Sequence, residues 1–153
     1  MTVLTMGIAA SSCSDDSCYD NGSSLPLATC YVGNSQQTIG GLTIKGIGAL
    51  GDSLLLDSAA VKEVYLPLRA TVGTTSYVLS RWLTTDTVTT LYSDTLTLDY
   101  EPIEYFHSVE CGAMYNFDIK RVTCTKHAID SVVLLTNHVT NSPAPALRIH
   151  FAQ

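Results

Sequence analysis

The sequence predicts an all-β protein, a single-domain antiparallel β-sandwich of Ig-like or transthyretin-like type with about 8–9 strands. Three observations lead to this expectation. The 153 residues are the length of one domain. With 46% hydrophobic and 14% charged residues, the chain can build a core and is not disordered. Nineteen Thr, twelve Val and eight Tyr favour strands over helices.

Nine short runs of β-forming residues follow one another from residue 25, separated by turn residues such as Gly33-Asn34 and Gly40-Gly41. The expected strands span residues 25–32, 42–50, 61–68, 76–83, 95–100, 103–107, 113–122, 131–137 and 147–151. Only residues 58–63 could form a helical turn, and that turn is too short to bury an apolar stripe.

Alternation of apolar and polar residues predicts which side of each strand is buried. In residues 95–100 it places Leu96, Leu98 and Tyr100 on the face opposite the intervening threonines and aspartate. The same period groups Tyr115, Phe117 and Ile119, and we expect both groups in one core between two sheets. Residues 132–135 form a continuous apolar run, which is typical of a central strand.

The N-terminus predicts an exported lipoprotein. Residues 1–12 are uncharged and mostly apolar or small, and Ala10-Ser11-Ser12-Cys13 resembles a lipobox, in which Cys13 carries the lipid. Ala10 stands where Leu is usual, and no Lys or Arg precedes the apolar stretch, so we expect a start codon further upstream. The alternative is an ordinary first strand over residues 2–10. The preferred division is a signal-peptide remnant at 1–12, an acylated Cys and tether at 13–24, and a β-sandwich at 25–153.

Cysteine usage agrees with an oxidising compartment. Without Cys13, four cysteines remain, and an even number allows three disulfide pairings among Cys18, Cys30, Cys111 and Cys124. Buried free thiols are the alternative. A zinc site is disfavoured because the four are scattered rather than closely paired.

Motifs for chemistry are sparse. The four histidines have no metal-binding spacing, no nucleophile elbow occurs, and the acidic pair Glu101 and Glu104 flanks a proline. The glycine pairs at 40–41 and 46/48 precede no helix that could bind phosphate, so turns and bulges are expected there. The net charge of −6, with no basic stripe, disfavours nucleic acid as a partner. We therefore predict no catalytic residue, no metal ligand and no cofactor.

Several segments together resemble a known family. They include Leu42-Thr43-Ile44-Lys45-Gly46-Ile47-Gly48, Val64-Tyr65-Leu66-Pro67-Leu68, Asp94-Thr95-Leu96-Thr97-Leu98-Asp99-Tyr100, Glu110-Cys111-Gly112 and Ile129-Asp130-Ser131-Val132. The chain is similar over nearly its whole mature length to small uncharacterised lipoproteins of Bacteroides-type bacteria, which form a domain of unknown function. The resemblance implies a disulfide between Cys18 and Cys111. Cys30 and Cys124 look like additions to the family pattern and are the candidate second pair.

Three functional hypotheses follow. The first is a non-enzymatic interaction or structural module, attached to the outer membrane through its lipid and facing the periplasm or the surface, with a protein or glycan partner. The second is a hydrolase or carbohydrate-active protein whose site combines a His with Asp99, Glu101 or Glu104 only in the fold. The third is a fibre or pilus-type subunit. A binding module predicts an exposed aromatic patch, an enzyme a pocket of titratable groups, and a fibre subunit a long exposed edge strand.

Overall fold

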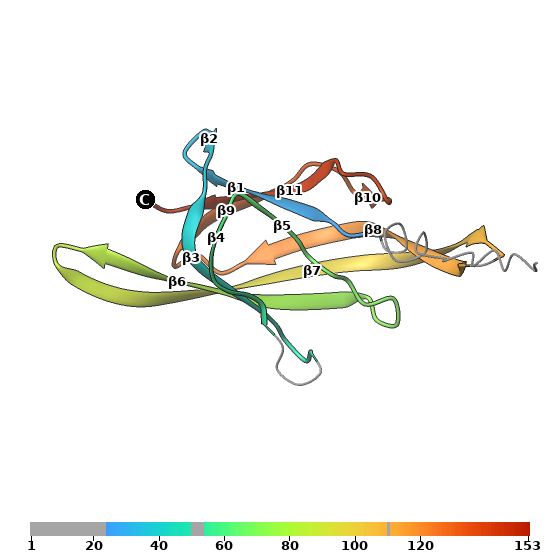
Figure 1. The fold of residues 1–153 in the computed structure, drawn as a ribbon, viewed down its shortest axis with the longest axis horizontal. Helices are drawn as coiled ribbons and strands as arrows, with labels where there is room; N and C mark the ends of the chain where they lie inside the picture. The colour runs from blue at the N-terminus through green and yellow to red at the C-terminus, as the bar shows by residue number, and fades with distance from the viewer. Residues whose placement is uncertain (1–23, 50–53, 110) are drawn as a thin grey trace, which may run out of the picture.

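The computed structural model describes residues 24–49, 54–109 and 111–153, and within them the chain is all-β, with eleven strands in two sheets (Figure 1). The predicted all-β, sandwich-like class is confirmed. No helix in the described part is long and apolar enough to cross a membrane.

The smaller sheet has five strands, in the order β2-β1-β11-β9 with β5 also paired to β1. Their bounds are Leu27–Val32 for β1, Ser35–Gln36 for β2, Glu63–Tyr65 for β5, Ile129–Leu134 for β9 and Pro145–Phe151 for β11. The central pair, β1 and β11, is parallel, with Cys30 opposite Ile149, so the expectation of a purely antiparallel fold is wrong at this pair.

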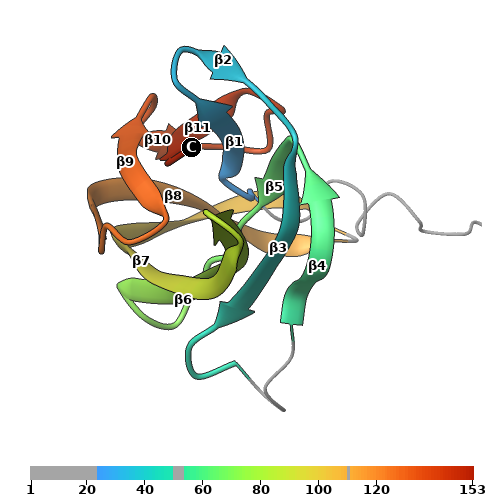
Figure 2. The ribbon, with the colours of Figure 1, turned by 90° about the vertical axis from the view of Figure 1, so that its left-hand side faces the viewer.

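The larger sheet has six strands, in the order β10-β8-β7-β6-β3-β4, and every pair is antiparallel. Their bounds are Ile39–Gly46 for β3, Leu54–Val61 for β4, Thr74–Thr85 for β6, Val88–Ser108 for β7, Gly112–Cys124 for β8 and His138–Val139 for β10. This sheet curls into a half-barrel that packs against the smaller sheet (Figure 2).

The core between the sheets confirms the predicted faces. Leu96, Leu98 and Ile119 are fully buried, and Tyr100 meets Phe117 edge to face at 5.3 Å between ring centroids. Tyr115 is half-buried and packs against the same cluster. The intervening residues of β7, from Thr95 to Asp99, are more exposed, as the alternation requires.

Three expectations about strands are wrong. Residues 95–100 and 103–107 belong to one strand, because β7 continues through Pro102 beside a bulge at Asp99/Tyr100. No helical turn forms at residues 58–63, because residues 58–61 belong to β4 and Glu63 begins β5. The apolar run at 132–135 belongs mainly to β9, an edge strand, where Val133 and Leu135 are 41% and 44% exposed.

The glycine pairs take the turn and bulge roles expected of them. Gly41 has φ +63° at the bulge between Ile39 and Leu42, and Gly48 has φ +74° in the turn after β3. Both backbone angles favour glycine over any residue with a Cβ.

Candidate functional site

The most prominent surface feature is a two-stranded ribbon formed by the ends of β6 and β7, seen at the left of Figure 1. The ladder from β3 to β6 ends at the pair Thr43–Ser80, and the ladder from β7 to β8 begins at Leu96. Between these points β6 and β7 continue to pair only with each other, as far as Thr85 opposite Val88. We define the ribbon as residues 80–93, of which residues 81–92 project beyond both neighbouring strands.

A two-residue loop closes the ribbon. Asp86 and Thr87 both have positive φ, 49° and 72°, as a type I′ hairpin turn requires. Asp adopts this conformation more readily than most residues, because its short side chain bonds locally, whereas the β-branched Thr is strained there.

The outer face of the ribbon carries one aromatic residue between two pairs of hydroxyls. Tyr77 and Leu79 point into the core, so period-two alternation places Trp82 on the outer face, opposite Leu91. The Ser80 and Ser93 hydroxyls bond at 2.7 Å on one side of this pair. The Thr84 and Thr89 hydroxyls bond at 2.9 Å on the other.

These apolar side chains are unusually open to solvent. Trp82 is 61% exposed and Leu91 47%, whereas Val88, beside the turn and 64% exposed, lies on the opposite face of the ribbon. No charged residue occurs on the outer face between the two hydroxyl pairs. The ribbon thus presents an uncharged, aromatic and hydroxyl-lined surface, and clustered exposed apolar groups of this kind commonly mark binding sites.

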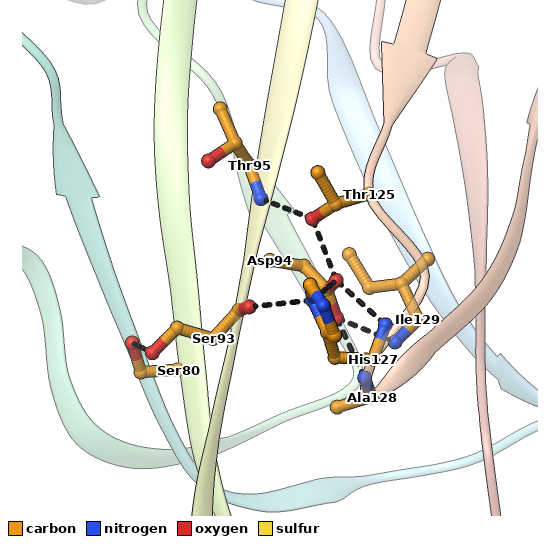
Figure 3. A network of polar contacts seen from close by, with 8 residues as sticks. All are labelled: Ser80, Ser93, Asp94, Thr95, Thr125, His127, Ala128 and Ile129. Carbon is orange, nitrogen blue, oxygen red and sulfur yellow. Dashed lines mark hydrogen bonds and ion pairs between the residues drawn. The ribbon is translucent and has the colours of Figure 1, made fainter.

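A buried carboxylate holds the base of the ribbon (Figure 3). Asp94, whose side chain is fully buried, accepts hydrogen bonds from the amides of His127, Ala128 and Ile129 at 2.7–2.8 Å. The Thr125 hydroxyl donates to it at 2.7 Å. The single carboxylate thereby fixes the connection between β8 and β9 to β7, next to the Ser80–Ser93 hydroxyl pair.

Hydrogen bonding also determines the ionisation of Asp94. Burial alone would raise its pKa, but the bonds from Thr125 and the three backbone amides together outweigh burial, and the pKa lies below its ordinary value of 3.8. Asp94 is therefore an anion in the native protein at neutral pH.

His127 completes this cluster from the solvent side. Its Nδ1 lies 3.0 Å from Asp94 Oδ1 and 3.1 Å from the Ser93 carbonyl oxygen, and both partners are acceptors. Nδ1 therefore carries the proton, which leaves Nε2 of the neutral ring as an acceptor. A histidine held by a buried carboxylate has the arrangement of a general base, but no hydroxyl or thiol of the described residues forms a hydrogen bond with Nε2.

The expected combination of a histidine with Asp99, Glu101 or Glu104 does not form among the described side chains. Asp99 instead bonds Thr74 and Arg121, and Glu101 forms an ion pair with Lys120 at 3.4 Å. The described histidines contact other groups, namely Asp94 for His127, Asp118 for His138 and the Gly33 carbonyl for His150. The side chain of His107 lies outside the described part.

The structure describes three of the five cysteines for which the sequence predicts a role, namely Cys30, Cys111 and Cys124. Cys13 and Cys18 lie outside the described residues, so the lipid site and the Cys18–Cys111 disulfide stay predictions. Cys111 is half-buried in the β7–β8 connection, where its amide bonds the Ser108 hydroxyl. Cys30 and Cys124 are free thiols in different sheets, which corrects the candidate second pair. Within the described ranges no three His, Cys, Asp or Glu side chains form a metal-binding group.

Cys30 should be chemically inert in the native protein. Burial, with a smaller contribution from the charge of Glu63, raises its pKa to about 11, so almost no thiolate exists at pH 8. We expect iodoacetamide to label Cys30 only after unfolding, as measured by peptide mass mapping. Faster native labelling of Cys30 than of the half-buried Cys124 would contradict its placement in the core.

The sheet edges bear on the fibre hypothesis. In the described part, the long edge strand β4 is interrupted by register shifts, and its Ser58 has φ 46°. Bulges of this kind hinder pairing with another chain. The other edges are β9, with six residues, and the two-residue β2 and β10 together with the three-residue β5.

Comparison with known proteins assigns the family. Residues 41–151 match the model of a family of unknown function, DUF6452. The chain belongs to this family. The DUF6452 match spans β4 to β11 completely and includes the ribbon, the Asp94 cluster and most of β3. No curated protein and no solved structure matches the chain.

Sequence reasoning missed the ribbon as a site, although a signal for it was present. The alternation that buries Tyr77 and Leu79 also assigns Trp82 to the opposite, outer face. A Trp on the solvent side of a strand, flanked on the same face by Ser80 and Thr84, is the pattern that indicates a binding surface.

Proposed function

We propose that this DUF6452 protein is a non-enzymatic, lipid-anchored binding module of the cell envelope, and that its β6–β7 ribbon binds a neutral glycan. The exposed Trp82, set between two hydroxyl pairs on an uncharged face, carries the proposal. The ribbon projects from the domain, so a large polymeric ligand could reach it without steric conflict with neighbouring strands.

The chemistry of the face matches a sugar ring. A pyranose presents a face of C–H groups surrounded by hydroxyls, and the C–H face packs well against the flat ring of an indole. Each of the four ribbon hydroxyls has one proton and two lone pairs, so after bonding its partner it keeps acceptor capacity for a sugar hydroxyl. Absence of charge on the face favours a neutral ligand over a charged one.

A protein partner fits the same face less well. Aromatic residues are enriched at protein interfaces, but serine is depleted there, and Ser and Thr are under-represented among residues that dominate binding energy. The outer face has a single aromatic anchor, Trp82, and four Ser or Thr residues, which form the two hydroxyl pairs. This composition supports a glycan.

Binding by calorimetry tests the glycan assignment. We expect at least one of a panel of neutral hexasaccharides, built from glucose, mannose, xylose or galactose, to bind the purified chain. Phe106→Ala is the matched control, since Phe106 is 71% exposed at the tip formed by β7 and β8, away from the ribbon. The control should bind as the wild type does, and failure of every saccharide to bind would refute the glycan assignment.

The lipid anchor rests on the sequence around Cys13. We expect the chain, expressed with an upstream start and a complete signal peptide, to incorporate a palmitate analogue and to fractionate with membranes. Cys13→Ala should abolish both, because the thiol accepts the lipid and several acyl chains are needed for stable attachment. Cys124→Ser controls for loss of a different thiol. A Cys13→Ala variant that remains labelled and membrane-bound would contradict the anchor.

A further inference from the structure

We propose that a second site, separate from the ribbon, binds an aliphatic carboxylate: a cavity between the β3–β4 end of the large sheet and the segment that leads into β6. Its apolar walls would hold the hydrocarbon chain, and Arg69 at its margin would bind the carboxylate. This site is independent of the proposed glycan surface.

The cavity has the size and lining of a small-molecule site. Its volume is ≈ 410 Å³, within the usual range for ligand pockets of roughly 300–1,000 Å³. The walls are mainly apolar and include Ile47, Ala49, Leu54, Leu55 and Pro67. Ile47 and Leu54 are 49% and 47% exposed, so an apolar ligand in the cavity would cover hydrophobic surface that is now in contact with water.

Arg69 supplies the one charged side chain among the described residues of the lining. Among the described residues its side chain forms one hydrogen bond, from Nη2 to the Thr74 carbonyl oxygen at 3.3 Å, which leaves most of the five guanidinium N–H donors for a ligand. No carboxylate in the described part of the chain forms an ion pair with it. A planar guanidinium with free donors binds a carboxylate through two parallel hydrogen bonds.

A buried tyrosine fixes the backbone that carries Arg69. The Tyr100 hydroxyl donates to the Arg69 carbonyl oxygen at 2.8 Å and accepts from the Arg69 amide at 3.0 Å. Because this hydroxyl has only one proton, the Thr75 hydroxyl is the donor in their 2.7 Å contact. The backbone position of Arg69 is thus set by its contacts with the core residue Tyr100.

The other polar groups of the lining are satisfied within the protein. The Tyr77 hydroxyl donates to the Pro67 carbonyl oxygen, and the Thr75 hydroxyl bonds Tyr100. These groups therefore have little need of a ligand, and Arg69 alone selects the head group. One cation at the margin of an apolar cavity matches a ligand with one anionic end and an apolar body, that is, a medium-chain fatty acid or a similar aliphatic carboxylate.

Calorimetric titration of the full chain with dodecanoate and with dodecanol, both below their aggregation concentrations, tests the proposal. We expect dodecanoate to bind about tenfold more tightly than dodecanol, because only the carboxylate pairs with Arg69. Arg69→Gln should weaken dodecanoate binding about tenfold and leave dodecanol binding within about twofold of the wild type. Dodecylamine should bind more weakly than dodecanol.

Two control variants distinguish binding in the cavity from the effects of changing the net charge or an exposed apolar residue elsewhere. Lys62→Gln removes one positive charge from an exposed residue outside the cavity and should not change dodecanoate binding. Ile47→Ser should weaken both dodecanoate and dodecanol, whereas Leu135→Ser, at a comparably exposed leucine outside the cavity, should weaken neither. The proposal is overturned if wild-type protein binds neither ligand, or if Arg69→Gln and Lys62→Gln weaken dodecanoate binding equally.

Discussion

Replacing Asp94 with Ala is expected to lower the free energy of unfolding by about 3–5 kcal/mol, the largest effect of any single substitution considered for this fold. The substitution leaves the amides of His127, Ala128 and Ile129 and the Thr125 hydroxyl without their acceptor in a site closed to water. Urea denaturation followed by circular dichroism measures the change.

A matched control is available on the same sheet. Asp118 also accepts from a histidine, His138, and lies near Lys120, but its side chain is 32% exposed and water can replace its partners. Asp118→Ala should therefore cost much less stability than Asp94→Ala. Equal losses for the two variants would contradict the assignment of Asp94 as the buried acceptor that fixes the β8–β9 connection.

The same carboxylate predicts a dependence of stability on pH. Because the pKa of Asp94 is lower in the folded than in the unfolded chain, its contribution is complete above the unfolded pKa near 3.8 and is lost as the pH falls through the lower folded pKa. Asp99 and Asp118, whose pKa values are also lowered, add to this acid sensitivity. Below about pH 4, the urea concentration at the midpoint of unfolding should therefore decrease as the pH falls in the wild type. In Asp94→Asn this decrease should be less steep.

Local periodicity predicted the parts of this fold that depend on one strand at a time. Alternation was sufficient to assign Leu96, Leu98 and Ile119 to the core, because the side-chain period of a strand fixes its faces. Alternation could not show whether a strand lies at the centre or at the edge of its sheet. The apolar run ending at Leu135 indicated a central strand, but β9 pairs on one side only, and nothing local distinguishes these cases.

The sequence could not predict which distant strands pair, because no local pattern identifies a strand's partner. The parallel pair of β1 and β11 joins residues 119 positions apart at Cys30 and Ile149, and the Asp94 bonds cross 33–35 positions to the β8–β9 connection. The alternation that buries Leu96 and Leu98 also places Asp94 on the inner face, but an aspartate before a Ser or Thr is ordinary turn chemistry and does not by itself indicate a buried carboxylate. Trp82 differs, since the alternation around Tyr77 already placed it outward.

The second large effect is expected at Trp82 itself. Trp82→Ala should weaken glycan binding by about 30-fold to 100-fold, because a central aromatic anchor typically contributes 2 kcal/mol or more to binding. It should cost at most about 1 kcal/mol of folding stability, since the exposed indole loses only its cross-strand contact with Leu91. Trp82→Phe should bind with intermediate affinity, because a smaller flat ring remains.

The separation of these two effects distinguishes a binding residue from a structural one. Calorimetry on Trp82→Ala gives the loss of affinity, and urea denaturation of the same sample gives the loss of stability. A Trp82→Ala variant that loses folding stability as well as affinity would indicate that Trp82 supports the ribbon rather than contacts the ligand. Leu83→Ala, at the next position of the ribbon and on its opposite face, is the matched control and should retain binding.

Intrinsic fluorescence tests the central claim most directly, because Trp82 is the only tryptophan of the chain. Its 61% exposure predicts red-shifted emission that acrylamide quenches readily in the free protein. Titration with a saccharide that binds should shift the emission to shorter wavelength and protect it from acrylamide, with the same affinity that calorimetry measures. Saturating saccharide that leaves both the emission maximum and the quenching constant unchanged would place the ligand away from Trp82 and contradict the ribbon as the glycan-binding surface.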